Sequence, residues 1–198
     1  MLQVGAGTNS LEGWLNTDQC PVNNRVVYMD AIQPFPFKDN TFEYVFSEHQ
    51  IEHLSYEEGL FMLGECYRIL KPGGKIRIAT PDLETLICLF TPDKSDIQKK
   101  YIDWVVARWL PHATVKKECF VINNAFRHWW HKFIYDRETL RHALESVGFA
   151  NLKYYDPGES DDETLRGIES HGIAIDNEEI NRFETMVLEG ERPIMDSN

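Results

Sequence analysis

The sequence predicts an α/β fold built on a mostly parallel β-sheet with helices on both faces. Strand-like apolar runs alternate with runs of helical periodicity along most of the 198 residues. A glycine turn containing Gly5 and Gly7 follows the first strand-like run, and Asp18 and Asp30 close the second and third runs. Because the carboxyl ends of parallel strands meet at one edge of a sheet, these groups could hold a small nucleoside there.

Individual elements are indicated by the alternation of strand-like and helical runs and by residues that start or stop helices. Strands are expected at residues 2–4, in the run that ends at 18, and at 26–30, 42–47, 75–79, 152–155 and 183–188. Capping boxes that begin at Ser55 and Ser95 predict two helices, the second ending near residue 110. Pro81 is expected at the first position of another helix, and Asp136 and Gly148 cap the ends of a fourth.

The chain is most simply a single domain, residues 1–198, and it is long enough to bury a full core. The stretch 91–133 differs in character, because it contains four of the five tryptophans and several other aromatic side chains. We expect it to be an aromatic-rich helical insertion that covers the carboxyl edge of the sheet as a lid. The acidic span 157–179 is expected to be a long and partly mobile loop.

The net charge of −12 argues against a nucleic-acid partner, because contact with phosphates requires a basic face. A small neutral or cationic substrate, or a protein, is easier to reconcile with this charge. The four cysteines are scattered without a C-x-x-C pair, which disfavours a zinc knuckle or a disulfide framework. No apolar run has transmembrane length and no signal peptide is recognisable, so we expect no membrane insertion and a cytoplasmic location.

The spacing of the first signals disfavours a dinucleotide. Ser10 stands where the dinucleotide fingerprint has its third glycine, and Asp18 comes only thirteen positions after Gly5, against roughly 20 in dinucleotide-binding folds. The segment 8–13 is too short for a crossover helix, whose N-terminus a pyrophosphate would need. S-adenosylmethionine has no phosphate, so a bare glycine loop would suffice for its amino-acid end.

The residues that carry these signals resemble a known family. They are Val4-Gly5-Ala6-Gly7-Thr8, the run 11–18, Asp30, Pro36-Phe37 with Asp39-Asn40 and Phe42, Glu52-His53-Leu54, and Leu70-Lys71-Pro72-Gly73-Gly74. Together they resemble the small class I S-adenosylmethionine-dependent methyltransferases, the type 11 group most of all, over most of residues 1–83. The resemblance implies a Rossmann-like methyltransferase fold, with a seven-stranded, mostly parallel sheet whose last strand is antiparallel.

The same resemblance implies S-adenosyl-L-methionine as cofactor and assigns residues to it. Gly5 and Gly7 would face its methionine part, Asp18 would bind the ribose hydroxyls, Asp30 the adenine amino group, and Ala31 would lie beside the ring. We also place Glu48, at the end of the fourth strand, with the cofactor. The assignment of the aspartates agrees with their chemistry, because ionised carboxylates accept hydrogen bonds from hydroxyl and amino groups.

The implied reaction moves a methyl group to an oxygen or nitrogen of a small-molecule acceptor, which by resemblance could be a sugar or glycan intermediate. The histidines at the expected acceptor side are candidates for the general base, since the pKa of imidazole lies near neutrality. His49 is the first candidate, His131 the second and His128 the third. Each of them could instead be a packed or hydrogen-bonded structural residue.

Three alternatives stay open. His49 and His53, like Glu48 and Glu52, are four residues apart, as metal ligands on one face can be; a structural role for His53 is favoured, and no metal is expected. A catalytically inactive module of the same fold is the second alternative. An NAD-dependent enzyme is the third, and it would have to bind NADH more tightly than S-adenosylhomocysteine.

Overall fold

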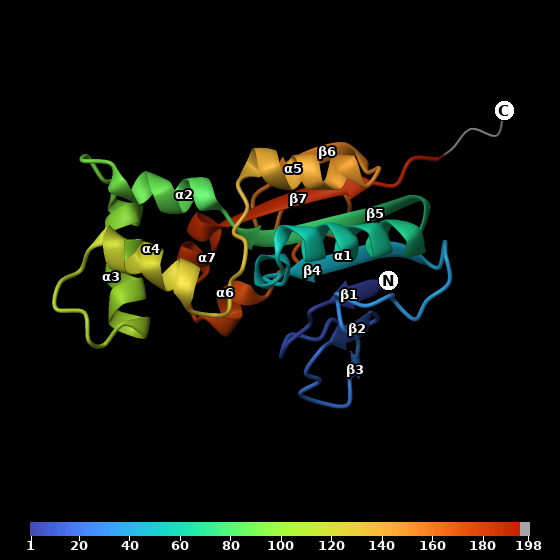
Figure 1. Ribbon diagram of the computed structural model, residues 1–198, viewed down its shortest axis with the longest axis horizontal. Helices are drawn as coiled ribbons and strands as arrows, with labels where there is room; N and C mark the ends of the chain where they lie inside the picture. The colour runs from blue at the N-terminus through green and yellow to red at the C-terminus, as the bar shows by residue number, and fades with distance from the viewer. Residues whose placement is uncertain (195–198) are drawn as a thin grey trace.

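Seven strands form one mixed sheet in the computed structural model, which describes residues 1–194 (Figure 1). They are β1 (Leu2–Val4), β2 (Leu15–Asp18), β3 (Val26–Tyr28), β4 (Phe42–Glu48), β5 (Leu70–Pro81), β6 (Ala150–Tyr155) and β7 (Thr185–Glu191). The sheet order is β3-β2-β1-β4-β5-β7-β6, and β7 runs antiparallel to both its neighbours. The predicted seven-stranded, mostly parallel sheet with an antiparallel last strand is confirmed.

The interior position of β1 in the sheet agrees with the burial of its three residues. Leu2 pairs with Leu15 on one side and with Val45 on the other, and Leu2 and Val45 are fully buried. A strand covered on both faces reads as a continuous buried run, as this one does. The parallel register brings the ends of β1, β2, β4 and β5 to the same edge of the sheet.

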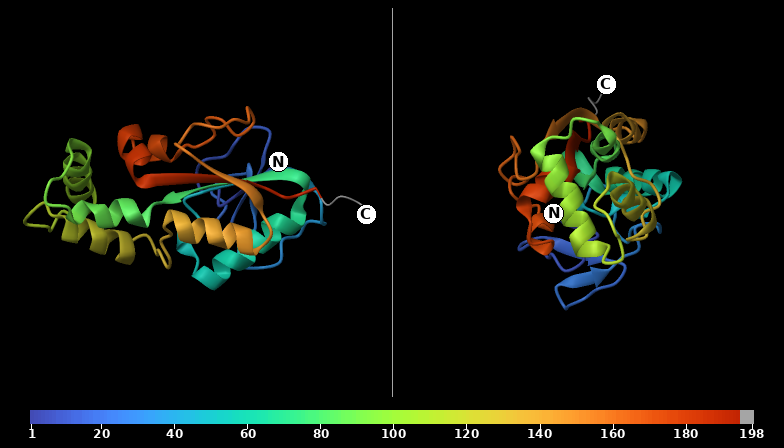
Figure 2. Two further views of the ribbon diagram at one scale, coloured as in Figure 1. Left: turned by 90° about the horizontal axis from the view of Figure 1, so that it is seen from above. Right: turned by 90° about the vertical axis from the view of Figure 1, so that its left-hand side faces the viewer.

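The helices are α1 (Tyr56–Ile69), α2 (Leu83–Ile87), α3 (Asp96–Trp109), α4 (Glu118–Arg127), α5 (Arg137–Ser146), α6 (His171–Ala174) and α7 (Glu178–Glu184), with short 3-10 turns η1 (Ile51–His53) and η2 (Cys88–Phe90). Helices α1 and α5 lie side by side on one face of the sheet, and α6 and α7 lie on the other side near its carboxyl edge (Figure 2). Both predicted capping boxes are present, at the starts of α1 and α3.

A second apolar cluster lies beyond the carboxyl ends of β4 and β5, at the left of Figure 1. It is formed by α2, α3 and α4, with Ile134 from the loop before α5 and Ile180 from α7. The stretch 91–133 is therefore helical over most of its length and carries its own apolar contacts. Its role as a lid stays a prediction.

Two local predictions were wrong. Pro81 does not begin a helix: it ends β5 opposite Thr185, and the Asp82 side chain caps α2 instead by accepting from the Glu84 amide. Phe183 lies in α7 rather than in a strand, and its ring packs against that of Tyr101.

The predicted long loop at 157–179 is correct for residues 157–170, but its last part contains α6 and the start of α7. Its acids are tied to the sheet. Asp162 pairs with Lys75, and Glu169 pairs with the fully buried Arg77. These contacts join residues about ninety positions apart, so no local sequence pattern could predict them.

Within residues 1–194, no helix combines the length and apolar character needed to cross a membrane. All four cysteines are free thiols, three of them exposed, and burial raises the pKa of the Cys66 thiol.

Candidate active site

A cavity of about 370 Å³ lies where the ends of β1 and β4 meet the aromatic insertion. One wall is the glycine loop 5–9 with the end of β4 and η1. The opposite wall is formed by one face of α3, by α4 and the loop after it, and by α6 and the end of α7. The cavity therefore joins the predicted cofactor edge to the predicted lid.

The glycine loop has the backbone that its sequence predicts. Gly5 and Gly7 have φ angles of +73° and +50°, in the left-handed region that glycine adopts without strain. A Cβ on Gly7 would meet nothing within 4 Å, whereas one on Gly5 would lie 2.5 Å from the Gln50 side chain. The loop thus exposes bare backbone toward the cavity at Gly7.

Asp18 and Asp30 lie at the ends of neighbouring strands, half-buried, and neither they nor Ala31 line the cavity itself. The Asp18 carboxylate accepts from the Gly7 amide at 2.8 Å and from the Cys20 amide at 2.7 Å. The Asp30 carboxylate accepts from the amide two residues on, at 3.1 Å. An ionised carboxylate has about four acceptor positions, so both retain capacity for a ligand.

His49 occupies a strained position directly after β4. Its φ of +47° is uncommon for a residue other than glycine, and such strain is concentrated at functional sites. Its Nδ1 lies 3.3 Å from Glu52 Oε1, and its Nε2 lies 3.2 Å from Thr185 Oγ1. Burial opposes charge on this imidazole, but Glu52, Glu184 and Glu48 outweigh it, so the pKa of His49 is raised.

Glu52 is a fully buried acid that partners His49. Its Oε2 accepts from Thr80 Oγ1 at 3.0 Å, whereas Oε1 forms no hydrogen bond of good geometry with any described residue. Burial opposes ionisation of this carboxyl group, but the contact with His49 outweighs it and lowers its pKa to about 2. Glu52 is therefore ionised and can stabilise a proton on His49.

His171 and Glu184 complete the centre, and sequence analysis missed both. The ring of His171 stacks on that of His49, with centroids 3.6 Å apart and planes at 16°. Burial and the neighbouring His49 lower the pKa of His171 to about 3, so it is neutral. Glu184 Oε2 accepts from the Tyr101 hydroxyl at 2.6 Å.

Glu48 points to the segment that carries His171. Its carboxylate accepts from the backbone amides of Ser170 and His171 at 2.9 to 3.1 Å, and from the Ser170 hydroxyl at 3.2 Å. Burial raises the pKa of Glu48. Its predicted contact with the cofactor stays a prediction, and its observed contacts hold α6 over the cavity.

Of the other two predicted bases, the structure places His131 at the cavity and His128 outside it. His131 lines the cavity, and its Nδ1 lies 2.8 Å from the Ala125 carbonyl oxygen, which leaves Nε2 as the free acceptor. Burial lowers the pKa of His131, so its imidazole is neutral near pH 7. His128 is exposed and does not line the cavity.

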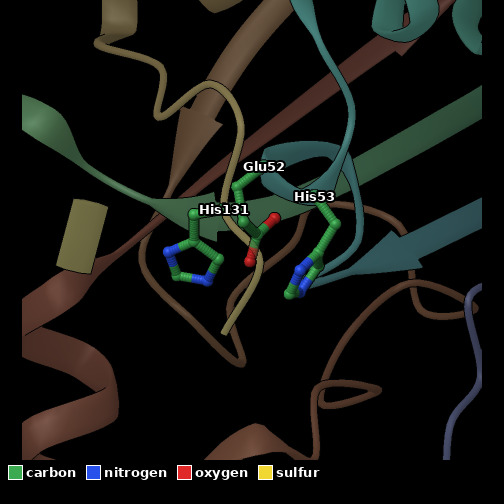
Figure 3. A group of neighbouring side chains, drawn as sticks. All are labelled: Glu52, His53 and His131. Carbon is green, nitrogen blue, oxygen red and sulfur yellow. The ribbon is translucent and has the colours of Figure 1, made fainter. Parts of the chain in front are cut away.

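Glu52, His53 and His131 form the group that could hold a metal ion, with ligand atoms within 4.8 Å of one another. Figure 3 shows the carboxylate between the two imidazoles. Because Glu52 already contacts His49 and Thr80, we interpret it as the partner of His49. The expectation that no metal is bound stays a prediction.

Comparison with known proteins decides the family. The type 11 family of methyltransferase domains matches residues 9–78, from the last residue of the glycine loop through most of β5. The chain contains a class I S-adenosylmethionine-dependent methyltransferase domain. Solved methyltransferases share the whole fold: a SAM-dependent methyltransferase from Archaeoglobus fulgidus is similar over 96% of this chain and 84% of its own, with a TM-score of 0.53 and 20% identity.

Two curated relatives show how far the methyltransferase similarity extends. The ubiquinone/menaquinone biosynthesis C-methyltransferase of Blochmanniella floridana is 27% identical over 67% of this chain and 48% of its own length. Phosphoethanolamine N-methyltransferase 2 of Caenorhabditis elegans is 48% identical over 28% of this chain and 13% of its own. The chain thus spans half or less of the length of these relatives, which act on different acceptor atoms.

The residues present in this methyltransferase fit its family's cofactor. The open Cβ position at Gly7 leaves room for a ligand against the backbone, and Asp18 and Asp30 retain acceptor capacity for hydroxyl and amino groups. No helix N-terminus for a pyrophosphate follows β1, because the chain passes from β1 to β2 without a helix. The individual assignments of Gly5, Gly7, Asp18, Asp30 and Ala31 stay predictions.

Proposed function

We propose that this chain transfers a methyl group from S-adenosyl-L-methionine to a nitrogen or oxygen of a small molecule held in the cavity, with His49 as the general base. The observation that carries the proposal is the His49–Glu52 pair: a strained imidazole that lines the cavity, backed by a fully buried, ionised carboxylate.

Gly5 and Gly7 would hold the amino-acid end of the cofactor, and Asp18 and Asp30 would hold the nucleoside. When bound, the cofactor supplies an electrophilic methyl group, so the protein needs only to position the acceptor, accept its proton and exclude water. The aromatic side chains of the insertion form the opposite wall of the cavity and would exclude water.

Neutral His49 accepts the acceptor's proton at Nε2, where the acceptor replaces the Thr185 hydroxyl that now lies 3.2 Å away, while Nδ1–H faces Glu52. The resulting imidazolium is stabilised by the Glu52 carboxylate 3.3 Å away, and this is why the pKa of His49 is raised although burial opposes it. His171 stays neutral beside it and adds no competing charge. A positioned base of this kind contributes roughly 10²–10⁴-fold to the rate.

Calorimetry with S-adenosylhomocysteine, followed by transfer of a tritiated methyl group to a panel of amines, phenols and sugars, tests the proposal. We expect micromolar binding of the cofactor product, and turnover that His49→Gln abolishes without loss of that binding. The absence of binding by either S-adenosylmethionine or its product would favour an inactive module of the same fold. Tighter binding of NADH would favour an NAD enzyme.

A further inference from the structure

We propose that the acceptor is an organic amine that enters the cavity as its ammonium ion, and that the cavity rejects phosphorylated and carboxylated molecules. This inference rests on the proposed function and narrows its substrate class. The charge of the cavity wall, the state of Glu184 and the aromatic rings of the insertion carry it.

The cavity wall has three carboxylates and no opposing lysine or arginine. Glu48, Glu52 and Glu184 line it, and no lysine or arginine among residues 1–194 does so. A phosphate or carboxylate group on the acceptor would meet buried negative charge with no cationic side chain to pair with it, which is costly in a low-dielectric site. An ammonium ion would instead be attracted by the carboxylates of the cavity wall.

Glu184 has neither the cationic partner of Glu52 nor the amide donors of Glu48. Glu48 is satisfied by backbone amides, and Glu52 is paired with His49. Glu184 is only 14% exposed and accepts one hydrogen bond, from the neutral Tyr101 hydroxyl. Its Oε1 lies 3.8 Å from Nε2 of His171, which is beyond hydrogen-bond distance.

Glu184 has no cationic partner in the state in which His49 acts as a base. His171 is neutral, and His49 must be neutral to accept a proton, so neither imidazole then offsets Glu52 or Glu184. Burial raises the pKa of Glu184. A bound ammonium ion would compensate this carboxylate, and it would reach Oε1 of Glu52 or Glu184, neither of which accepts a hydrogen bond of good geometry.

The insertion provides the second element of an ammonium site. Tyr101 and Trp104 share one face of α3, and Trp109 lies edge-to-face between Trp104 and Trp129, with centroid distances of 6.2 and 4.6 Å. Aromatic faces attract cations, and the attraction is stronger when the ion is desolvated. Trp129 lines the cavity, and its backbone has a positive φ of +63°.

The reaction balances with the groups present. The ammonium N–H proton passes to Nε2 of His49 and leaves a lone pair on nitrogen. That lone pair forms the new N–C bond as the C–S bond of the donor breaks and its electron pair stays on sulfur. An amine that enters as a cation therefore becomes a nucleophile only beside the base.

Calorimetry on the chain saturated with S-adenosylhomocysteine tests the inference. The probes are 2-phenylethylamine, 2-phenylethanol and phenylacetate, which share a skeleton and differ in charge, together with a size series of amines from ethanolamine to tryptamine. We expect the best amine to bind at least tenfold more tightly than its alcohol, with phenylacetate weakest. Glu184→Gln, which keeps an oxygen for Tyr101, should remove this preference and leave S-adenosylhomocysteine affinity unchanged.

Glu163→Gln is the matched control, because Glu163 is exposed and lies outside the cavity. It should leave the amine preference intact, and Trp109→Leu should weaken amine binding about fivefold. Equal or tighter binding of the alcohols across the series would overturn the inference, as would stoichiometric binding of Zn²⁺ or Mn²⁺ that excludes the amine. If the unmodified chain does not bind S-adenosylhomocysteine, the proposed function itself is contradicted.

Discussion

The imidazole rings of His49 and His171 are stacked 3.6 Å apart, although the two residues come from the end of β4 and the start of α6. Two charged imidazoles could not share this geometry, and the structure resolves the conflict by burial. The pKa of His171 falls to about 3, while the pKa of His49, which faces Glu52, is raised. The stack therefore holds the proposed base in position, and the neighbouring carboxylates raise its pKa.

Replacing the stacked ring tests this positioning role. His171→Phe keeps an aromatic ring beside His49, and because His171 is neutral, we expect the activity and its pH profile to change little. His171→Ala removes the support and should lower kcat by up to about 100-fold, the cost of a misplaced catalytic group. Steady-state rates across pH 5 to 9 check this. An equal loss of kcat in His171→Phe and His171→Ala would contradict a positioning role.

The dependence of the rate on pH reports the Glu52–His49 pair. His49 must be neutral to accept a proton, so the rate should rise with pH through a pKa above 6.5. Glu52→Gln removes the carboxylate that most favours the charged imidazole, and should move this rising limb to lower pH while reducing the maximal rate. Glu48, Glu184 and His171 also face His49, and all are retained in the variant.

An unchanged rising limb in Glu52→Gln would show that another group controls the profile. His131→Gln provides the comparison, because His131 already has a lowered pKa and should leave the limb above 6.5 in place.

Cofactor affinity should depend on Asp18 and Asp30. Conversion of Asp30 to asparagine keeps an oxygen for the amide that it binds, and conversion of Asp18 keeps an oxygen for one of its two amides. Both changes remove the charge offered to hydroxyl and amino groups. Each change should weaken S-adenosylhomocysteine binding roughly 10- to 100-fold, since a hydrogen bond to a charged group contributes about 1.5–3 kcal/mol. Asp93→Asn, at an exposed site outside the cavity, should bind like the wild type in calorimetry.

Stability should depend strongly on Arg77. This fully buried side chain pairs with Glu169 and Glu189, and so joins the acidic segment to β5 and β7. Arg77→Met leaves two mostly buried carboxylates unpaired and should lower the free energy of unfolding by about 3–5 kcal/mol. Urea denaturation measures the loss. Adding Glu169→Gln and Glu189→Gln should restore part of it, and failure to do so would contradict the pairing.

Elements with local signals were predictable. Ser55 and Ser95 mark the starts of α1 and α3 because a capping side chain binds amides only three residues away. Gly148 follows α5 with a φ of +108°, as its position after the last apolar residue indicates. At Pro81 a local signal misled, because pairing with Thr185 across the sheet and capping by Asp82 outweighed the preference of proline for a first helical turn.

Only the part of the candidate site that depends on local sequence signals was predictable. His49 and Gly7 follow strands, and the ends of parallel strands meet at one edge, so their proximity could be inferred from sequence. His171 and Glu184 lie more than a hundred residues further along, the first in a span predicted to be a loop and the second in a run predicted to be a strand. Contacts with Glu48 and Tyr101 place them.

The sequence by itself determined the α/β class, the glycine turn, the strand-end acids and the capped helices, because each depends on residues within a few positions of one another. Only the tertiary structure decided which acid meets which histidine, and which imidazole carries charge. Those outcomes depend on burial and on pairings between distant segments, and a carboxylate or imidazole acquires its pKa only when the whole chain has packed around it.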